Sequence, residues 1–407
     1  MTDTVEVVEL SRWDQVRDAY RRKELRQAMY DEGAVVMAGC LLDLHGDAHR
    51  DRRRLENRLF RREIFTYWER EVLGSTIDAT LAPFIASGTG DLPVIGYRCA
   101  MNLTATIAGI DHDPTDSDAV AELEVAVKKL SEGATLVHST RDRDIVRTEV
   151  EELKADFVAS RLAPSRERRQ AIIDDVRAGN ADPDALPRDV LTTLLWNEDG
   201  LDLSGDVIER EVCFYLQAGG HSTANAFTHT IDDLFGWAAQ HPADLQRAHD
   251  GRLFAQRCMH ESLRLNPASP VAWRRPLSDV TLADGTVLPE GSRVVIDLVA
   301  ANRDTEVWGP DADRFDPHRA VPDGANAWGM SFGGGRHACI GQELDGGLEV
   351  LDGADPAEHL YGTVPATVSA FLAAGGRPDP DRPPTLDPNT QRKHFSTYPV
   401  VFDRRNP

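Results

Sequence analysis

Long apolar runs, paired cysteines and an excess of basic residues are all missing from this 407-residue chain. No stretch of about eighteen consecutive apolar residues occurs, which argues against a transmembrane helix. The N-terminus also has neither the basic segment nor the apolar segment of a secretion signal. We therefore expect a cytoplasmic protein that is not embedded in a membrane.

Cysteine is scarce, with five residues and no Cys-x-x-Cys pair; they are Cys40, Cys99, Cys213, Cys258 and Cys339. An odd number without such a pair is typical of a reducing compartment and argues against both a disulfide framework and a cysteine zinc site. Four of the five are expected to be packing residues.

Basic residues are outnumbered, with 45 Lys and Arg against 67 Asp and Glu and a formal net charge of −22. Such a balance argues against nucleic acid as a partner, because phosphate binding needs a basic surface. One segment departs from it, an expected helix over about 48–60 with an arginine-rich continuation: Arg50, Arg52, Arg53, Arg54, Arg58, Arg61 and Arg62. These arginines form a solvated face, a docking patch for an acidic protein, or partly both.

Linkers and internal repeats are also lacking, although the length alone would suggest two or three domains. The Pro/Gly-rich stretches at 178–187 and 363–388 are short, and a helical pattern continues on both sides of them. We expect one mainly helical domain spanning residues 1–407.

The most informative segment that is present runs from Ser331 to Leu344 and contains Cys339. Glycines at 333, 334 and 335 let the backbone turn tightly and approach a flat ring, while Arg336 and His337 offer charge or hydrogen bonds to carboxylates on its rim. An isolated cysteine after a glycine-rich turn is usually a buried, inert thiol. The resemblance of the whole segment to a known haem-binding loop implies a metal ligand instead.

This segment resembles the haem-binding loop of the cytochrome P-450 family, Phe-Gly-x-Gly-x-His-x-Cys-x-Gly-x-x-Leu-Ala. Every position matches until Asp345 replaces the final Ala. The resemblance implies Cys339 as the iron ligand of haem b (iron protoporphyrin IX). It also implies that the ring contacts Phe332, Gly333, His337 and Gly341.

Further segments in the same order along the chain match the family. Glu261 and Arg264, three residues apart on an expected helix ending before Asn266, resemble its buried Glu-x-x-Arg pair, and Arg319 takes the place of the third member of that network. Arg274 aligns with the arginine that binds a haem propionate, and His49 with Arg53 resembles its His-x-x-x-Arg. Buried carboxylates need such donors.

A long helix is expected from about 204 to 240, capped by Ser204 and free of proline. Its middle resembles the family's Ala-Gly-x-(Asp or Glu)-Thr-Thr, which lies on the haem and helps to deliver protons to dioxygen. Here the pattern starts with Ala218 and Gly219 at the haem, and the catalytic positions are His221, Ser222 and Thr223. Successive glycines at 219 and 220 weaken a helix and are expected to open a groove in it.

Histidine in place of the family's carboxylate leaves two interpretations open. An imidazole can shuttle protons near neutral pH. Alternatively, His221 faces away from the haem and hydrogen-bonds a neighbour, as residues at this position often do in the family. Ser222 keeps the hydroxyl in either case.

The resemblance implies a monooxygenase that hydroxylates or epoxidises a hydrophobic small molecule with dioxygen. No Gly-x-Gly-x-x-Gly, flavin or iron–sulfur motif is present, so a ferredoxin-type electron donor with its reductase is expected. The donor is expected to dock on Arg50, Arg54 and Arg58. Two alternatives remain: a peroxide-using or non-oxygenating haem-thiolate enzyme, and a non-catalytic haem protein that binds a ligand.

The substrate pocket is expected to be mainly apolar, although core packing would explain the same composition. Besides the long helix, it takes part of 34–44 and the segment after the Glu-x-x-Arg helix; the residues expected to line it are Val271, Ala272, Trp273 and, from a C-terminal hairpin, Phe395.

Two departures from the family qualify the expected fold, which is mainly α with small β-sheets. The N-terminal region is shortened, and an acidic insertion at about 345–362 follows the cysteine loop. This insertion is either a tolerated surface loop or a segment that reshapes the docking face.

Overall fold

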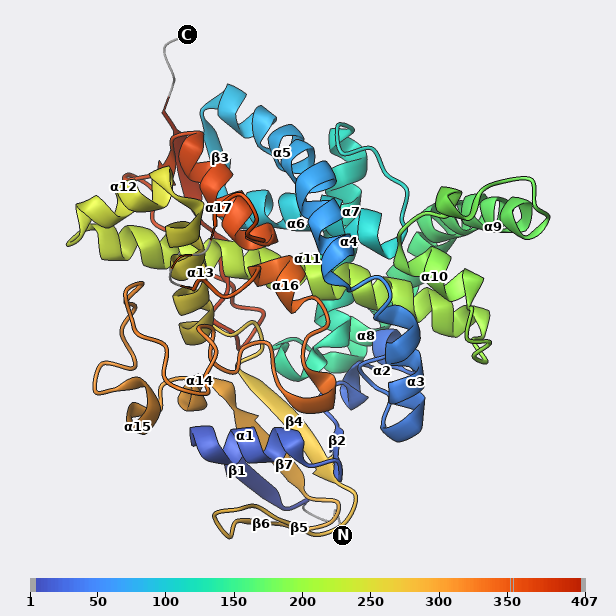
Figure 1. Cartoon of the computed structure of the whole chain (residues 1–407), viewed down its shortest axis with the longest axis horizontal. Helices are drawn as coiled ribbons and strands as arrows, with labels where there is room; N and C mark the ends of the chain where they lie inside the picture. Colours follow the sequence, from blue (N-terminus) through green and yellow to red (C-terminus); the bar gives the residue numbers. More distant parts are fainter. Residues whose placement is uncertain (1–4, 352, 354, 404–407) are drawn as a thin grey trace.

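The computed structural model describes residues 5–351, 353 and 355–403. Helices dominate it (Figure 1), and they are α1 (Trp13–Arg21), α2 (Ala34–Met37), α3 (Gly46–Glu56), α4 (Arg62–Tyr67), α5 (Gly74–Ser87), α6 (Leu92–Ala108), α7 (Ser117–Ala134), α8 (Arg143–Phe157), α9 (Ala163–Arg177), α10 (Val190–Trp196), α11 (Gly205–Ala238), α12 (Pro242–Asp250), α13 (Arg252–Leu265), α14 (Leu298–Ala301), α15 (Thr305–Trp308), α16 (Gln342–Gly346) and α17 (Thr363–Ala373).

Four small sheets complete the fold. The largest has the strand order β1 (Val7–Leu10), β7 (Arg293–Asp297), β4 (Val271–Pro276) and β2 (Leu25–Gln27). A three-stranded sheet has the order β3 (Thr89–Asp91), β11 (Pro399–Phe402) and β8 (Gly376–Pro378), and the two hairpins pair β5 (Val280–Thr281) with β6 (Val287–Leu288) and β9 (Thr385–Leu386) with β10 (Phe395–Thr397). A mainly α fold with small sheets was predicted, and it is confirmed.

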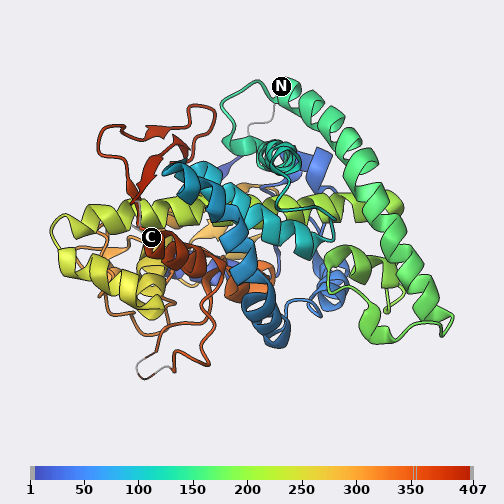
Figure 2. The same ribbon diagram turned by 90° about the horizontal axis from the view of Figure 1, so that it is seen from above.

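Helix α11 is the centre around which the molecule is built. It runs through the middle of the structure in two perpendicular views, with α6, α7, α13 and α17 packed against it (Figures 1 and 2). The Ser204 hydroxyl caps it by accepting a hydrogen bond of 3.3 Å from the Val207 amide, as predicted. Most residues in the central part of α11 are buried, so contacts on several sides fix the positions of its side chains.

The groove predicted at Gly219 and Gly220 is wrong, because α11 continues through both glycines without a break. A Cβ atom on Gly219 would lie 2.8 Å from the Thr104 side chain of α6, and one on Gly220 would lie 2.8 Å from Val127 of α7. The two glycines therefore let three helices approach one another closely.

The apolar core has two parts. The larger is formed by the helices around α11, and the smaller lies between α1 and the four-stranded sheet, where Leu10, Trp13, Val294 and Ile296 pack together. No helix in the described part of the chain is both long enough and apolar enough to span a membrane.

Short helices lie on both sides of Cys339 in the sequence. A single turn of 3₁₀-helix over Gly335–His337 precedes Cys339, and α16 begins three residues after it. Gly335 has a φ of +64°, and a Cβ there would lie 1.9 Å from the Tyr20 carbonyl oxygen, so both the conformation and the contact with α1 require glycine. The predicted insertion includes residues 352 and 354, which lie outside the described residues, and its first two residues belong to α16. Its end is held by Glu69, which accepts hydrogen bonds from the Tyr361 and Gly362 amides (3.0 and 2.8 Å).

Candidate active site

The cysteine loop is held in a defined shape by backbone and side-chain bonds. The Cys339 amide donates to the Phe332 carbonyl at 2.8 Å, which closes the loop. At its start, the Ser331 hydroxyl donates to the Leu263 carbonyl of α13 at 2.7 Å and accepts from Asn302 at 3.0 Å. The loop therefore presents its cysteine from a rigid base.

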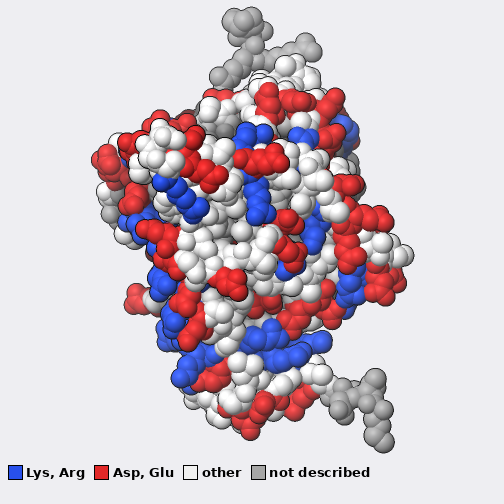
Figure 3. Space-filling view, turned by 90° about the vertical axis from the view of Figure 1, so that its right-hand side faces the viewer, with Lys and Arg blue, Asp and Glu red and all other residues white. Residues whose placement is uncertain are grey.

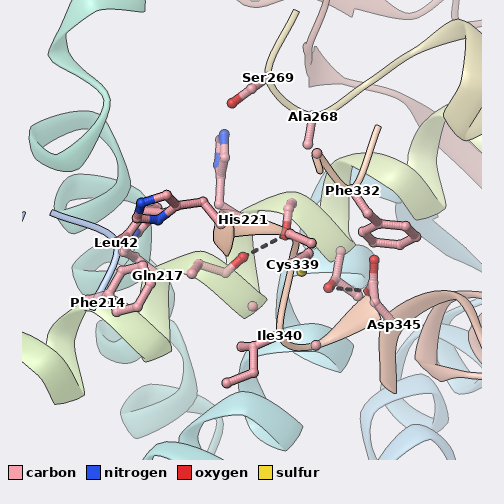
Figure 4. Close-up of a pocket in the computed structure, with 18 of the residues that line it drawn as sticks. Leu42, Phe214, Gln217, His221, Ala268, Ser269, Phe332, Cys339, Ile340 and Asp345 are labelled. Carbon is pink, nitrogen blue, oxygen red and sulfur yellow. Dashed lines mark hydrogen bonds between the residues drawn. The ribbon is translucent and has the colours of Figure 1, made fainter. Parts of the chain in front are cut away.

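Cys339 opens onto an internal cavity of about 320 Å³, which Phe332, Ile340 and His221 also line (Figure 4). It is exposed to this cavity, whereas the other four cysteines are buried, as predicted for packing residues. Burial within the molecule and the nearby Asp345 carboxylate raise the pKa of Cys339 to about 11. Without a metal ion the group is therefore a neutral thiol, and coordination is what would make it a thiolate.

A set of donors from three distant segments lines the same cavity. His49 and Arg53 come from α3, Arg274 from β4, and His337 from the cysteine loop. The structure thus brings together all four residues predicted to bind the carboxylates of the ring.

These donors have no anion of their own among the described residues. Arg274 is 5% exposed, and its guanidinium donates only to the Gln27 side chain (2.7 Å) and the Trp273 carbonyl (2.9 Å). Arg53 donates to the Arg336 carbonyl at 3.2 Å. Burial lowers the pKa of Arg274 because no carboxylate compensates its charge.

The two imidazoles carry unsatisfied atoms as well. His49 Nε2 and His337 Nδ1 are buried without a hydrogen-bond partner, and the two rings lie in a tilted arrangement with centroids 4.2 Å apart. Unpaired buried donors beside two uncompensated guanidinium groups are costly unless a ligand with carboxylates binds there. The residues therefore fit a haem, whose two propionates would pair with them.

The predicted catalytic residues of α11 all line the cavity too. The Ser222 hydroxyl donates to the Ala218 carbonyl at 2.5 Å, and the Thr223 hydroxyl donates to Asp345 at 2.5 Å. Asp345, which replaces the family's alanine, is thus tied to α11. Burial raises the pKa of this carboxyl group to about 6.

His221 is hydrogen-bonded through Nδ1 to the Tyr97 hydroxyl, while its Nε2 is buried without a partner. Burial holds the pKa of His221 well below its usual value, so the ring is neutral near neutral pH. The ring bonds a neighbour, as in the second interpretation, but it does not face away, because it lines the cavity. Proton transfer by His221 stays a prediction.

The structural network predicted around Glu261 is also assembled. Arg264 forms two hydrogen bonds of 2.7 Å to the Glu261 carboxylate, and Arg319 donates to the same carboxylate at 3.0 Å. Arg264 also donates to the carbonyls of Asn302 and Ala312, so it joins α13 to the segment that leads to the cysteine loop.

Two predicted pocket residues do not line the cavity. Trp273 alternates along β4 with Ala272 and Arg274, so its side chain faces the other side of the sheet, where Arg293 stacks on it at 4.5 Å. Phe395 packs instead against His229 and Tyr398. Val271 and Ala272 do line it, as do Leu41 and Leu42.

Residues without a motif complete the cavity, and the sequence offered no signal for them. Tyr30, Ser131, Thr135 and Arg392 line it from three separate segments, since Ser131 and Thr135 both lie at the end of α7. No cluster of three or more His, Cys, Asp or Glu that could hold a metal ion occurs within residues 5–351, 353 and 355–403.

Comparisons with known proteins agree with this site. Residues 246–344 match the family model described as Cytochrome P450. The chain is also similar to the crystal structure of CalO2, with a TM-score of 0.73 and 20% identity over 99% of this chain and 93% of that one. The chain belongs to the cytochrome P450 family. Members of this family hold haem through a cysteine thiolate.

Two curated relatives of this cytochrome P450 match over shorter stretches. One is the "Self-sufficient cytochrome P450 monooxygenase CYP505E3" of Phanerodontia chrysosporium, 31% identical over 38% of this chain and 17% of that protein. The other is "Cytochrome P450 4F12" of Homo sapiens, 30% identical over 44% of this chain and 38% of that protein. The matches thus span less than half the length of these relatives.

Proposed function

We propose that this cytochrome P450 is a haem-thiolate monooxygenase that hydroxylates or epoxidises a lipophilic small molecule. The observation that carries the proposal is the opening of Cys339 onto a cavity in which Arg53 and Arg274 have no anionic partner. Membership of the cytochrome P450 family supports it.

In this proposal Cys339 is the iron ligand of haem b, and His49, Arg53, Arg274 and His337 bind its propionates. Bound in this way, the haem supplies the activation of dioxygen. The protein residues orient the ring and keep bulk water from it. The apolar side chains of Leu103, Ile107 and Phe214, which line the cavity, would contact the body of the substrate.

Ser222 is proposed to hold the proton that dioxygen activation consumes. Its hydroxyl is anchored to the Ala218 carbonyl within α11 and needs only to rotate to donate elsewhere. His221, neutral and bonded to Tyr97, is proposed to position this end of the cavity.

Replacing Ser222 by Ala is expected to lower the product formed per electron pair consumed by about tenfold, because a positioned proton donor is removed. Product and nicotinamide consumption are measured together in a reconstituted system. Ser222→Thr, which keeps the hydroxyl, is the control and should retain coupling. Unchanged coupling in Ser222→Ala would remove this residue from the proton path.

Electrons are proposed to come from a ferredoxin-type protein with its reductase, docking beside α3. Arg53 joins α3 to the cysteine loop through the Arg336 carbonyl, so a donor bound to α3 would lie near the haem edge. The predicted helix over 48–60 ends earlier, at Glu56. Of the three docking candidates, Arg50 pairs with Asp47 (2.6 Å), Arg54 with Asp199 (3.4 Å), and Arg58 with both Glu198 and Asp199.

A docking partner would therefore compete with acidic residues of the same molecule. Figure 3 shows basic side chains lying next to acidic ones on one face of the molecule. Since exposed ion pairs contribute little stability, an acidic partner can replace them at small cost.

The proposed function is tested by reducing the haem-loaded protein under carbon monoxide and recording its Soret band. A red-shifted band typical of thiolate ligation is expected, and an imidazole-type band would contradict Cys339 as the ligand. Turnover with a ferredoxin system, and its absence with peroxide alone, would then separate a monooxygenase from a peroxide-using enzyme. A non-catalytic haem protein would turn over with neither.

A further inference from the structure

A third guanidinium group lines the cavity besides those of Arg53 and Arg274, which are proposed to bind the two haem propionates. Arg392 lies between β9 and β10 and lines the cavity together with Ser131, Thr135 and His221. Its side chain donates to the hydroxyls of Thr135 (2.9 Å) and Thr390 (3.4 Å). No carboxylate in the described part of the chain forms an ion pair with it within 4.0 Å.

Arg392 is half-buried in the cavity wall, and its charge has no ion-pair partner among the described residues. Burial lowers its pKa to about 10, and the smaller effects of Tyr97, Tyr30 and Asp387 oppose this change. A half-buried cation that faces a cavity without a counter-ion is costly, and its place in the cavity wall points to an anion that enters from outside.

Backbone bonds hold Arg392 in this position. The neighbouring Gln391 amide donates to the His138 carbonyl at 2.8 Å, and the Thr140 amide donates to the Asn389 carbonyl at 3.1 Å. Thr390 also forms a bridge with Ser139. Figure 2 shows the hairpin that carries this segment, in dark red, beside α11. The guanidinium is thus placed before any ligand binds, which lowers the entropic cost of binding.

Two further polar atoms of the cavity wall lack partners. Ser131 Oγ and His221 Nε2 are buried and unbonded, and both residues line the cavity beside Arg392. Burial lowers the pKa of His221 and His394 well below the usual value and that of His138 to about 3, so these rings are neutral. The group as a whole thus offers one positive charge and several neutral donors.

This group is distinct from the residues proposed to bind the haem propionates. Arg392 bonds the hydroxyls of Thr135 and Thr390, whereas Arg274 bonds Gln27 and the Trp273 carbonyl. Tyr30, which also lines the cavity, lies within electrostatic reach of both Arg274 and Arg392. The cavity wall therefore carries one cationic group besides those proposed for the propionates.

We propose that the substrate of this cytochrome P450 is a lipophilic carboxylic acid whose carboxylate pairs with Arg392. The planar guanidinium matches a carboxylate in shape, and its single charge matches one carboxylate rather than a doubly charged phosphate. The apolar wall at Leu103, Ile107 and Phe214 accepts the rest of the molecule. This proposal rests on the proposed function, to which it adds the class of substrate.

The test uses the full-length, haem-loaded protein at neutral pH and three matched pairs of probes: octanoic, decanoic and dodecanoic acids with their primary amides. Binding is followed by the shift of the Soret band and, independently of the haem spectrum, by calorimetry. We expect at least one acid to bind about tenfold or more tightly than its amide, because the charge-assisted bonds to Arg392 are lost with the amide.

The variant Arg392→Gln should remove this preference and leave amide binding unchanged, while Arg392→Lys should restore part of it. Arg382→Gln is the matched control, since Arg382 precedes the same hairpin, is 56% exposed and pairs with Asp379. It should bind the acids like the unmodified protein.

Equal binding of acids and amides, no binding of either, or a preference for acids that survives in Arg392→Gln would overturn the proposal. The carbon monoxide band is recorded on the same samples. A thiolate band without a preference for acids refutes the substrate class alone. A missing thiolate band refutes the proposed function, and calorimetry still reports whether Arg392 binds the acid.

Discussion

Replacing Cys339 by Ser is expected to abolish the red-shifted carbon monoxide band and to lower monooxygenation by more than about a hundredfold. Loss of a residue that merely supports a metal ligand already costs about 10–100-fold, so loss of the ligand itself costs more. Serine is nearly isosteric with cysteine but is a poor donor of electron density to iron. The loop itself should persist, because it is closed by the backbone bond between Cys339 and Phe332.

Cys99→Ala is the control for this change. Cys99 is buried in α6 and does not line the cavity, so its replacement should leave the carbon monoxide band in place. Retention of the thiolate band in Cys339→Ser would show that another residue binds the iron, and the proposed function would have to be abandoned.

The largest effect on stability is expected for Arg264→Ala, which should lower the free energy of unfolding by about 3–5 kcal/mol. Arg264 is fully buried and bonds Glu261, Asn302 and Ala312. Without Arg264, the Asn302 and Ala312 carbonyl groups lose their hydrogen-bond donor. Glu261 keeps its ion pair with Arg319. Urea unfolding of the haem-loaded protein, followed by circular dichroism and by haem release, measures the change.

Arg50→Ala is a suitable comparison, because Arg50 forms exposed ion pairs on α3. Its removal should change stability by no more than about 0.5 kcal/mol. Similar effects for the two variants would mean that the buried network is not what holds α13 to the segment before the cysteine loop.

Motifs with fixed spacing predicted the parts of this site that depend on local structure. The cysteine loop and the end of α13 lie where the sequence placed them, because glycine turns, caps and helix stops act over a few residues. The side chains of Trp273 and Phe395 were misplaced, since only the strand register and the packing of the C-terminal hairpin set the directions in which they point.

Local sequence patterns also could not predict the structural role of the two glycines in α11. Two successive glycines predict a weakened helix, but Thr104 and Val127 pack against them, so the glycines are contact points between helices. Arg54 of α3 and Arg58 just after it are a second example, because their acidic partners Glu198 and Asp199 come from the segment after α10.

The amino-acid sequence alone was thus enough to identify a mainly helical cytochrome P450 with its cysteine loop, because helical patterns and motifs are each determined by a short segment of the chain. Only the folded molecule places Arg392, Ser131 and His221 around one cavity with Cys339. These four residues are as many as 261 positions apart in the chain. Contacts between them arise from the packing of whole helices and hairpins, and no spacing rule predicts such contacts.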